Sequence, residues 1–380
     1  MHIPFNKPFY GQAEAANLQK ALQNGRLSGD GEFTRACHQW LARQFGFERA
    51  LLTGSCTAAL EMAALLACIG PGDEVILPSY TFTSTANAFL LRGATVRLCD
   101  SQPGHPNIDL QQAAKLVSPR TKALVLVHYA GMACQMEQAQ QLCQRHGLWL
   151  VEDAAQAFNS FYLGQPLGSF ADFAAFSFHD TKNVCAGEGG LLLVKDQALL
   201  PLASSMRDKG TNRADFLQGK ADAYEWTSTG SSFLPSEMTA AVLHAQFGKL
   251  PEIERRRQYI WQRYQEAAAP LQQAGLAMLP QVPEGACHNA SIFYLMFCSH
   301  QARQQATRWL HGHGVQANFH YTALHLSQFG QQIARKSHLP NAARFSRCLL
   351  RLPLYPELNE VEIDYISQLL QKMLHEIPAC

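Results

Sequence analysis

Four polar side chains follow two apolar, strand-like runs of the sequence. Ser177 and Lys182 come at the end of ADFAAFSF and just beyond it, and Asp153 and Gln156 stand in the same relation to the earlier run LWLVE. An amine, a carboxylate, an amide and a hydroxyl are the groups that pyridoxal phosphate (PLP) requires for its aldehyde, ring nitrogen, ring hydroxyl and phosphate. The pattern therefore predicts a PLP site with Lys182 and Asp153 as its catalytic residues.

Glycines and strand alternation refine this assignment. The GEGG motif (187–190) allows the backbone beyond Lys182 to approach a ligand closely. A lysine there would bond to the PLP aldehyde, be displaced by an incoming amine, and then act as general base. Glu152 points to the opposite face of its strand, so we expect Asp153 to face PLP, although a carboxylate there could also cap a turn.

The motif TGSCTAAL (53–60) places small polar residues where a helix is expected to begin. Ser55 suits the N-cap position, and the backbone N–H groups from Cys56 onward would lack a partner within the helix. Together with the helix dipole, they would form an anion site. Alone, the motif is more typical of a plain capped helix, but Ser177 as a second hydroxyl favours a phosphate site.

Aromatic side chains follow the strand-like run EVILP (74–78). Tyr80 and Phe82 could stack on a flat heteroaromatic ring, whereas such residues more often fill a core. Both interpretations stay open for these two residues.

Strand-like and helix-like runs alternate through the first half of the chain. The strand-like runs are 74–78, 94–100, 122–128, 148–153, 171–178 and 190–195, and the helical patterns between them include 57–69, 109–117 and 134–146. Continuous apolar strands with intervening helices predict an α/β fold with a mostly parallel central sheet covered on both faces. Ligands of such sheets bind at the carboxyl ends of the strands, where the PLP candidates lie.

The pattern changes after about residue 235, where two long amphipathic helices are predicted. Further strand and helix signals follow, and a final helix is expected near the end; the segments are 236–250, 253–268, 290–298, 306–314, 315–320 and 361–377. We therefore predict a large cofactor-binding domain at 1–250 and a smaller C-terminal α/β domain at 251–380.

Composition excludes several function classes. The chain has 380 residues, is 47% hydrophobic and 16% charged, and carries a net charge of +1 without a basic tract, so neither nucleic acid nor a membrane is an expected partner. The cysteines form no CxxC pair, which fits free thiols in the cytoplasm. The histidine pairs 311/313 and 320/325 lack the spacing and acidic partner of a zinc site, so no metal is expected.

The motifs GSCTAAL, PSYTF, VEDAAQ, SFHDTKN and GEGG together resemble the DegT-type sugar-nucleotide aminotransferases. The resemblance runs through the whole chain, and VEDAAQ with SFHxxKN is its most specific part. It implies a fold-type I, aspartate aminotransferase-like PLP enzyme, homodimeric, with active sites shared between the subunits.

The resemblance also implies a role for each motif residue. By the resemblance, Lys182 forms the Schiff base and Asp153 pairs with the ring nitrogen. Gln156 lies near the ring hydroxyl, and Phe82 stacks on the ring face. The phosphate is held by Ser177, Cys56 and Thr57. Many members carry an asparagine that reaches the phosphate across the dimer. Leu234 stands at that position here, so either Ser232 replaces the asparagine or the phosphate has one partner fewer.

Three further segments are candidates for substrate binding. A sugar nucleotide carries a diphosphate that cations must hold, and RDKGTNR (207–213) supplies several, although a solvated basic turn has the same composition. The loop GDGEFT (29–34) could close over the sugar, and FHYTALH (319–325) belongs to the pattern of the resemblance. The candidate residues are Asp30, Phe33, Lys209, Arg213, His320 and Tyr321.

The reaction implied by the resemblance is a ping-pong transamination from L-glutamate to the C4 ketone of dTDP-4-keto-6-deoxy-D-glucose. The products would be 2-oxoglutarate and dTDP-4-amino-4,6-dideoxygalactose. Opposite stereochemistry at C4 and a 3-keto sugar substrate stay open. Lys182 argues against the C3 dehydratases of this group, which carry a histidine instead, and a PLP-fold regulator would usually carry a DNA-binding segment that is not visible here.

Overall fold

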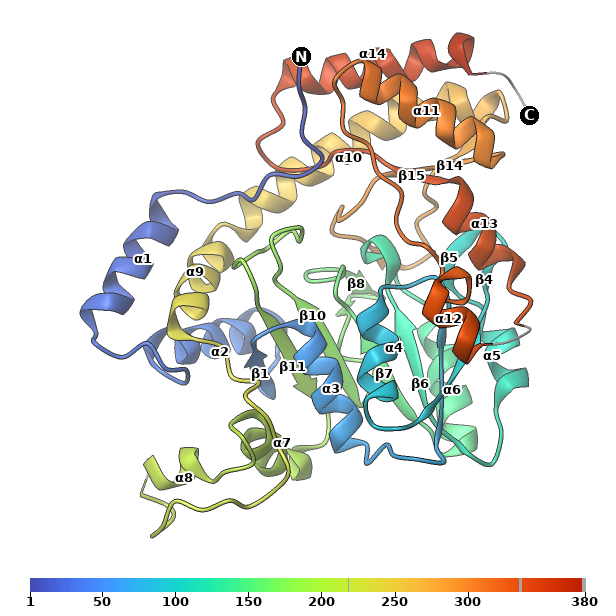
Figure 1. Cartoon of the computed structure of the whole chain (residues 1–380). Helices are drawn as coiled ribbons and strands as arrows, with labels where there is room; N and C mark the ends of the chain where they lie inside the picture. The colour runs from blue at the N-terminus through green and yellow to red at the C-terminus, as the bar shows by residue number, and fades with distance from the viewer. Residues whose placement is uncertain (218, 335–336, 378–380) are drawn as a thin grey trace.

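The computed structural model describes residues 1–217, 219–334 and 337–377. Its centre is a seven-stranded sheet (Figure 1). In spatial order the strands are β1 (Ala50–Thr53), β11 (Gly190–Val194), β10 (Phe173–Ser177), β7 (Trp149–Asp153), β6 (Thr121–Val127), β2 (Glu74–Pro78) and β3 (Thr95–Cys99). The predicted mostly parallel sheet is confirmed, and β1, a short strand, was missed by the sequence analysis.

Strand β11 is the exception to the parallel arrangement, because it runs antiparallel to both β1 and β10. A parallel neighbour needs a crossover connection, usually a helix, whereas the segment 178–189 returns directly to the adjacent position. This return loop carries Lys182. Its direct path keeps the lysine at the carboxyl end of β10.

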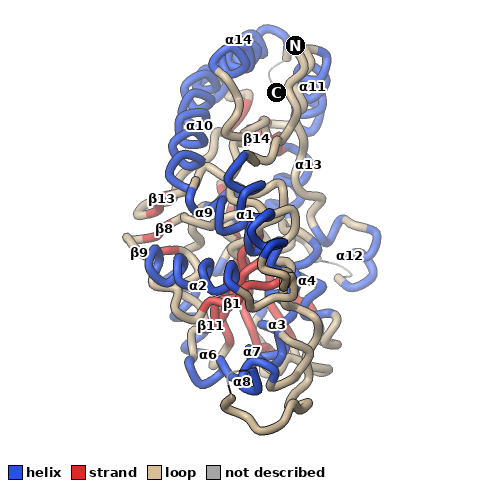
Figure 2. Tube along the Cα trace, turned by 90° about the vertical axis from the view of Figure 1, so that its left-hand side faces the viewer, coloured by secondary structure: helices blue, strands red, loops and turns tan. Residues whose placement is uncertain are grey.

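Helices cover both faces of the sheet, as predicted (Figure 2). Strand residues alternate between the faces: Ala123 and Val125 pack in one cluster, and Leu124 and Leu126 in another. The first face is covered by α3 (Cys56–Leu66), α4 (Thr83–Leu90) and α7 (Leu200–Arg207). The second face is covered by α2 (Glu32–Phe45), α5 (Leu110–Leu116), α6 (Met136–His146) and α9 (Glu237–Gly248).

The C-terminal part has its own core beside a three-stranded antiparallel sheet. Its elements are α10 (Leu250–Gln273), β12 (Ala277–Met278), β14 (Tyr294–Phe297), α11 (His300–Gly312), α13 (Pro340–Cys348), β15 (Leu349–Arg351) and α14 (Glu360–Glu376). The segment 315–320, which belongs to the predicted strand and helix signals, forms neither element: it makes only isolated bridges, from Val315 to Ile3 and from Asn318 to Arg351. The two-domain division near residue 250 stays a prediction, since the first residues of the chain pack with the C-terminal part.

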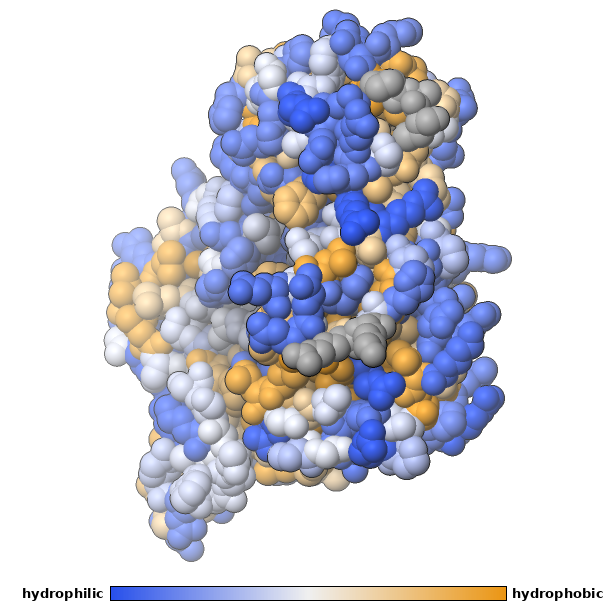
Figure 3. Space-filling view, turned by 45° about the vertical axis from the view of Figure 1, so that its right-hand side comes forward, coloured by the Kyte–Doolittle hydropathy of each residue, from blue (hydrophilic) through white to orange (hydrophobic). Residues whose placement is uncertain are grey.

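Short elements complete the chain. They are α1 (Gln12–Gln23), β4 (Ser101–Gln102), β5 (His105–Ile108), β8 (Phe161–Tyr162), β9 (Gln165–Pro166), α8 (Arg213–Leu217), β13 (Ala286–Cys287) and α12 (Gln328–Ile333). Within the described residues, no helix is both long enough and apolar enough to cross a bilayer. On the face shown in Figure 3, hydrophilic residues cover most of the upper, C-terminal part, and apolar residues reach the surface chiefly in the lower body.

Candidate active site

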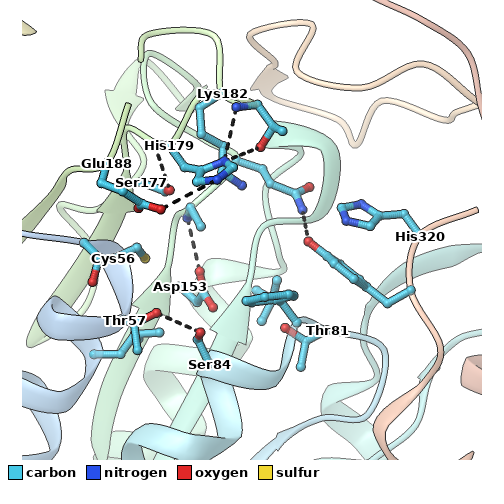
Figure 4. A pocket seen from close by; sticks show the side chains of 18 residues that line it. Cys56, Thr57, Thr81, Ser84, Asp153, Ser177, His179, Lys182, Glu188 and His320 are labelled. Atoms are coloured by element: carbon cyan, nitrogen blue, oxygen red, sulfur yellow. Dashed lines mark hydrogen bonds and ion pairs between the residues drawn. The ribbon is translucent and has the colours of Figure 1, made fainter. Parts of the chain in front are cut away.

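The carboxyl ends of β7 and β10 open into a cavity of about 440 Å³ (Figure 4). This size suits a small ligand. Among the residues predicted to act on PLP or the sugar, those that line it are Ser55, Cys56, Thr57, Phe82, Asp153, Gln156, Ser177, Lys182, His320 and Tyr321. The fold therefore brings together motifs that lie far apart in the sequence.

Asp153 faces this cavity and is almost completely buried. Its carboxylate accepts hydrogen bonds from Thr85 Oγ1 at 2.7 Å and from the backbone N–H of Ala155 at 3.2 Å. Burial raises the pKa of Asp153, and these two hydrogen bonds partly oppose the rise. A cationic N–H in the cavity would favour the ionised form of Asp153, which is the pairing that a protonated pyridine nitrogen offers.

Glu152 lies on the other side of the strand, as alternation predicts. Its carboxylate accepts hydrogen bonds from the backbone N–H groups of Gly168, Phe170 and Ala171 and contacts His128 Nε2 at 2.9 Å. Glu152 is therefore a buried structural carboxylate that fixes the turn before β10.

Lys182 projects from the return loop between β10 and β11 into the cavity (Figure 4). Burial lowers the pKa of Lys182, which favours the neutral, nucleophilic amine. No residue in the described part of the chain forms a hydrogen bond or ion pair with its Nζ atom at contact distance. The amine is thus available to a ligand.

The return loop is held in place by the N-terminal segment, which sequence reasoning missed. Tyr10 donates its hydroxyl hydrogen to Asp180 Oδ1 at 2.6 Å and accepts from the backbone N–H of Gly187 at 2.9 Å. Asn6 donates to the carbonyl oxygen of Asp180 at 3.0 Å. No local pattern reveals these contacts, because the partners lie far apart in the chain.

The start of α3 forms the polar end of the cavity. Ser55 is the N-cap residue, and its hydroxyl accepts from the backbone N–H of Ala58 at 3.1 Å. Cys56 and Thr57 of the first turn line the cavity, and Ser177 pairs with Gly190 in the adjacent ladder. A helix N-terminus beside a hydroxyl fits a phosphate group.

Gly190 allows this arrangement because β11 passes very close to α3. A Cβ atom at Gly190 would overlap the carbonyl group of Ser55 and lie 2.5 Å from the backbone nitrogen of Cys56. We expect Gly190→Ala to push the first turn of α3 away, lower the free energy of unfolding by about 1–3 kcal/mol, and weaken PLP binding. Thermal unfolding and absorbance titration of the apoprotein with PLP measure the two effects.

Gly70→Ala is the matched control for this prediction, since a Cβ atom at Gly70 would meet nothing within 4 Å. It should leave both measurements near those of the wild type. Unchanged PLP affinity in Gly190→Ala would contradict a phosphate site at this helix terminus.

The structure separates the two aromatic candidates of the PSYTF motif (78–82). Tyr80 is buried in the core, whereas Phe82 is 55% exposed and lies at the cavity, its ring 5.9 Å from that of Tyr321. Gln156 accepts from the backbone N–H of Ala130 at 2.6 Å and donates to the Tyr321 hydroxyl at 2.9 Å. Phe82 and Gln156 are thus the aromatic and amide groups available to a flat ring.

His320 is held as a neutral donor. Arg351 donates from Nη1 to His320 Nδ1, so the ring hydrogen of a neutral His320 must reside on Nε2. Burial, with the positive charges of Arg351 and Lys182, lowers the pKa of His320 well below its ordinary range. His320 therefore presents an N–H group that does not titrate near neutral pH.

The loop 29–34 is anchored rather than free to close. Glu237 accepts hydrogen bonds from the backbone N–H groups of Gly31, Phe33 and Thr34 and from the Thr34 hydroxyl, which caps α2. The Phe33 side chain is only 4% exposed and packs in the core. The prediction that Phe33 contacts a substrate is therefore corrected for this chain: its apolar ring serves the packing of α2.

The remaining predicted residues lie outside the cavity lining. Asp30 forms an ion pair with the buried Arg207 at 2.6 Å. Lys209 and Arg213 both pair with Asp208, at 2.7 and 3.3 Å. Ser232 is exposed, and its backbone forms an isolated β-bridge with Asp208. Within one chain, these four side chains do not line the cavity that contains Lys182.

Several cavity residues were not singled out from the sequence. They are Leu60, Thr81, Ser84, Val127, Ala155, His179, Thr181 and Glu188. His179 and Thr181 lie inside the SFHDTKN motif, and their hydrogen bond of 3.0 Å shapes the loop. Their position beside Lys182 was the signal that could have found them.

Residues 9–371 match the DegT/DnrJ/EryC1/StrS aminotransferase family. The chain belongs to this family. It is similar to the spore coat polysaccharide biosynthesis protein SpsC of Bacillus subtilis, with 32% identity over 378 residues that cover 96% of this chain and 95% of SpsC.

Solved structures agree with the family. The aminotransferase TlmJ from Streptoalloteichus hindustanus is 29% identical, with a TM-score of 0.90 and 99% of each chain covered. An aminotransferase from Psychrobacter cryohalolentis is 26% identical, with a TM-score of 0.92, and the match covers 98% of this chain and 100% of that one. The fold is thus that of the fold-type I PLP enzymes, as predicted.

Enzymes of this family are PLP-dependent sugar aminotransferases, so this chain is a transaminase and its cofactor is PLP. The residues present fit the cofactor. The amine of Lys182 is available, the carboxylate of Asp153 faces the same cavity, and the close approach at Gly190 leaves the α3 terminus open to a phosphate.

Proposed function

We propose that the enzyme transfers the amino group of L-glutamate to the C4 ketone of dTDP-4-keto-6-deoxy-D-glucose. The products are dTDP-4-amino-4,6-dideoxygalactose and 2-oxoglutarate. The family supports a sugar nucleotide as substrate. The segments IPFNKP, RDKGTNR and RLPLYPEL support this member of the family, because they resemble the transaminase of enterobacterial common antigen synthesis.

The observation that carries the proposal is the common cavity of Lys182 and Asp153. PLP supplies a carbonyl group that bonds amines and a ring that accepts electrons. With PLP bound, Asp153 would hold a negative charge toward the ring nitrogen. Within each half-reaction, Lys182 would move a proton between the substrate carbon and the cofactor, off the donor carbon in the first and onto the sugar carbon in the second.

The other cavity residues would hold the cofactor and orient the substrate. Ser55, Cys56, Thr57 and Ser177 line the cavity and would hold the phosphate, Gln156 would lie near the ring hydroxyl, and Phe82 would lie on the ring face. His320 and Tyr321 border the space left for the sugar. Lys182 in the cavity also favours transamination over C3 dehydration.

We further propose a cytoplasmic homodimer with shared active sites. Asp30, Lys209, Arg213 and Ser232 lie outside the cavity of their own chain, which supports a role toward the cavity of a second copy. There the two cations would hold the diphosphate, and Ser232 would replace the missing asparagine at Leu234.

Arg213→Ala tests the diphosphate role. We expect it to raise the KM for the dTDP-sugar by about tenfold, the scale of one charge-assisted hydrogen bond. The half-reaction with L-glutamate should stay nearly unchanged, because glutamate carries no phosphate. Single-turnover measurements of the two half-reactions decide the matter.

The control is Arg145→Ala on the exposed face of α6. Equal losses in both half-reactions would assign Arg213 to the fold or to cofactor binding.

Product analysis tests the substrate assignment. Purified enzyme with L-glutamate and dTDP-4-keto-6-deoxy-D-glucose should form the 4-amino-galacto product, identified by its C4 configuration in NMR coupling constants. The gluco epimer would establish the opposite stereochemistry. Turnover only with a 3-keto sugar nucleotide would move the reaction to C3.

A further inference from the structure

The return loop between β10 and β11 carries a carboxylate close to the reacting amine. His179, Thr181 and Lys182 line the active-site cavity (Figure 4), and Asp180 is the member of this stretch that does not. The Lys182 backbone N–H donates to the carbonyl oxygen of His179 at 2.8 Å, so residues 179–182 form a tight turn. A lysine has a flexible four-carbon stem that could bring its amine to a carboxylate in the same turn. The amine stays unpaired only if the Asp180 side chain is held elsewhere.

Side chains of the N-terminal segment hold Asp180. Tyr10 donates its hydroxyl hydrogen to Asp180 Oδ1 at 2.6 Å, and Asn6 Nδ2 donates to the Asp180 carbonyl oxygen at 3.0 Å. The Tyr10 hydroxyl also accepts from the backbone N–H of Gly187 at 2.9 Å, at the far end of the loop. Among the described residues, the Cys185 thiol is the other titratable group that faces this pair. One tyrosine thus fixes both the carboxylate and the end of the loop.

Tyr10 is suited to this contact because its hydroxyl keeps its hydrogen. Burial, with the hydrogen bond to Asp180, raises the pKa of Tyr10. The neighbouring carbonyl oxygen of Phe9 accepts from Gln246 Nε2 at 2.7 Å and from Lys249 Nζ at 2.8 Å. These two anchors belong to α9 and to the residue after it. The position of Tyr10 is therefore set from outside the loop that it holds.

The groups that face Lys182 from other elements already balance its charge. Burial lowers the pKa of Lys182, Cys56 and Asp153 act in the opposite direction, and Arg351 lowers it further. His320 also faces the amine. A second carboxylate beside the amine would raise the pKa of Lys182, since an opposite charge favours the charged form. A protonated amine can neither attack a carbonyl group nor accept a proton.

We propose that Tyr10 is a positioning residue that keeps the Asp180 carboxylate away from Lys182, with Asn6 holding the backbone of the same aspartate. The inference rests on the proposed function, in which Lys182 is the reacting amine. The hydrogen bond gives the carboxylate a neutral partner outside the cavity, so the amine stays neutral and reactive. Tyr10 lies outside the cavity lining and acts only through Asp180.

Tyr10→Phe, with and without Asp180→Asn, tests this role, and PLP is the probe. Apoprotein is mixed with PLP over a series of neutral to alkaline pH values and reduced with borohydride after a short, fixed time. Mass spectrometry then quantifies the modified Lys182 peptide. The pH of half-maximal attachment reports the pKa of the amine. In Tyr10→Phe it should rise by about one pH unit, the effect of a nearby opposite charge, because Asp180 can then turn toward the amine.

In Tyr10→Phe/Asp180→Asn, the half-maximal pH should return to that of the wild type, because the released side chain carries no charge. Both variants lose the hydrogen bonds of Tyr10, so a merely loosened loop would shift them alike. Tyr259→Phe is the matched control and should change nothing. Its hydroxyl likewise donates to a carboxylate, Glu360 Oε2 at 2.7 Å, and accepts from Arg263 at 2.8 Å, but it lies outside the cavity lining.

Two results would overturn the positioning role while leaving the proposed function intact. One is an unchanged half-maximal pH in Tyr10→Phe. The other is a shift that persists in the double variant, which would assign Tyr10 to the order of the loop through Gly187. Attachment of PLP to a lysine other than Lys182 in the wild type would instead overturn the proposed function, and this inference with it.

Discussion

Replacing Lys182 by alanine should abolish turnover and leave no cofactor covalently attached after borohydride reduction. Among the described residues that line the cavity, Lys182 is the only lysine. Without it, both the covalent bond and the proton transfer at the substrate carbon are lost; proton transfer alone is worth about 10²–10⁴-fold in rate. Mass spectrometry of the reduced protein and a steady-state assay measure the two losses.

Lys195→Ala is the matched control. Lys195 also follows a strand of the central sheet, but it is exposed and outside the cavity. It should keep both turnover and the covalent cofactor. The Lys182→Ala protein should still bind PLP without a covalent bond, through the α3 terminus and Ser177. A covalent cofactor in Lys182→Ala would mean that another lysine is the reactive one.

Asp153→Asn should reduce turnover by at least about a hundredfold, the scale of removing a charged stabiliser from an active site, while folding stays nearly intact. The reduction follows from loss of the charge that keeps the ring nitrogen protonated. Stability persists because the amide oxygen can accept from the backbone of Ala155, and its NH₂ group can donate to Thr85 Oγ1, where the carboxylate accepts. Turnover and thermal unfolding of the same preparation measure both.

Glu152→Gln provides the opposite case. Its carboxylate holds three backbone N–H groups and His128 in the core, so the amide should lower stability. Residual turnover per folded molecule should exceed that of Asp153→Asn. Wild-type turnover in Asp153→Asn would reduce Asp153 to a structural cap on the turn after β7.

The sequence by itself determined the family, the sheet and the centre of the site. Beyond their first, charged residue, the runs EVILP and KALVLV are apolar because their strands are covered on both faces, so the burial of these strands can be predicted from short stretches of sequence. Ser55 begins α3 as its side chain predicts, since N-capping depends on residues within one turn. Lys182, Asp153, Gln156 and Ser177 meet because parallel strands end at one edge of the sheet.

Only the tertiary structure decided which polar residues serve the fold and which face the cavity. Glu237 caps α2 from a distant part of the chain, Arg207 is paired with Asp30, and Phe33 is packed in the core. Tyr10 fixes the return loop, and Arg351 stands behind His320. Periodicity and capping report contacts within a few residues, whereas these pairs form between segments that the folded chain alone brings together.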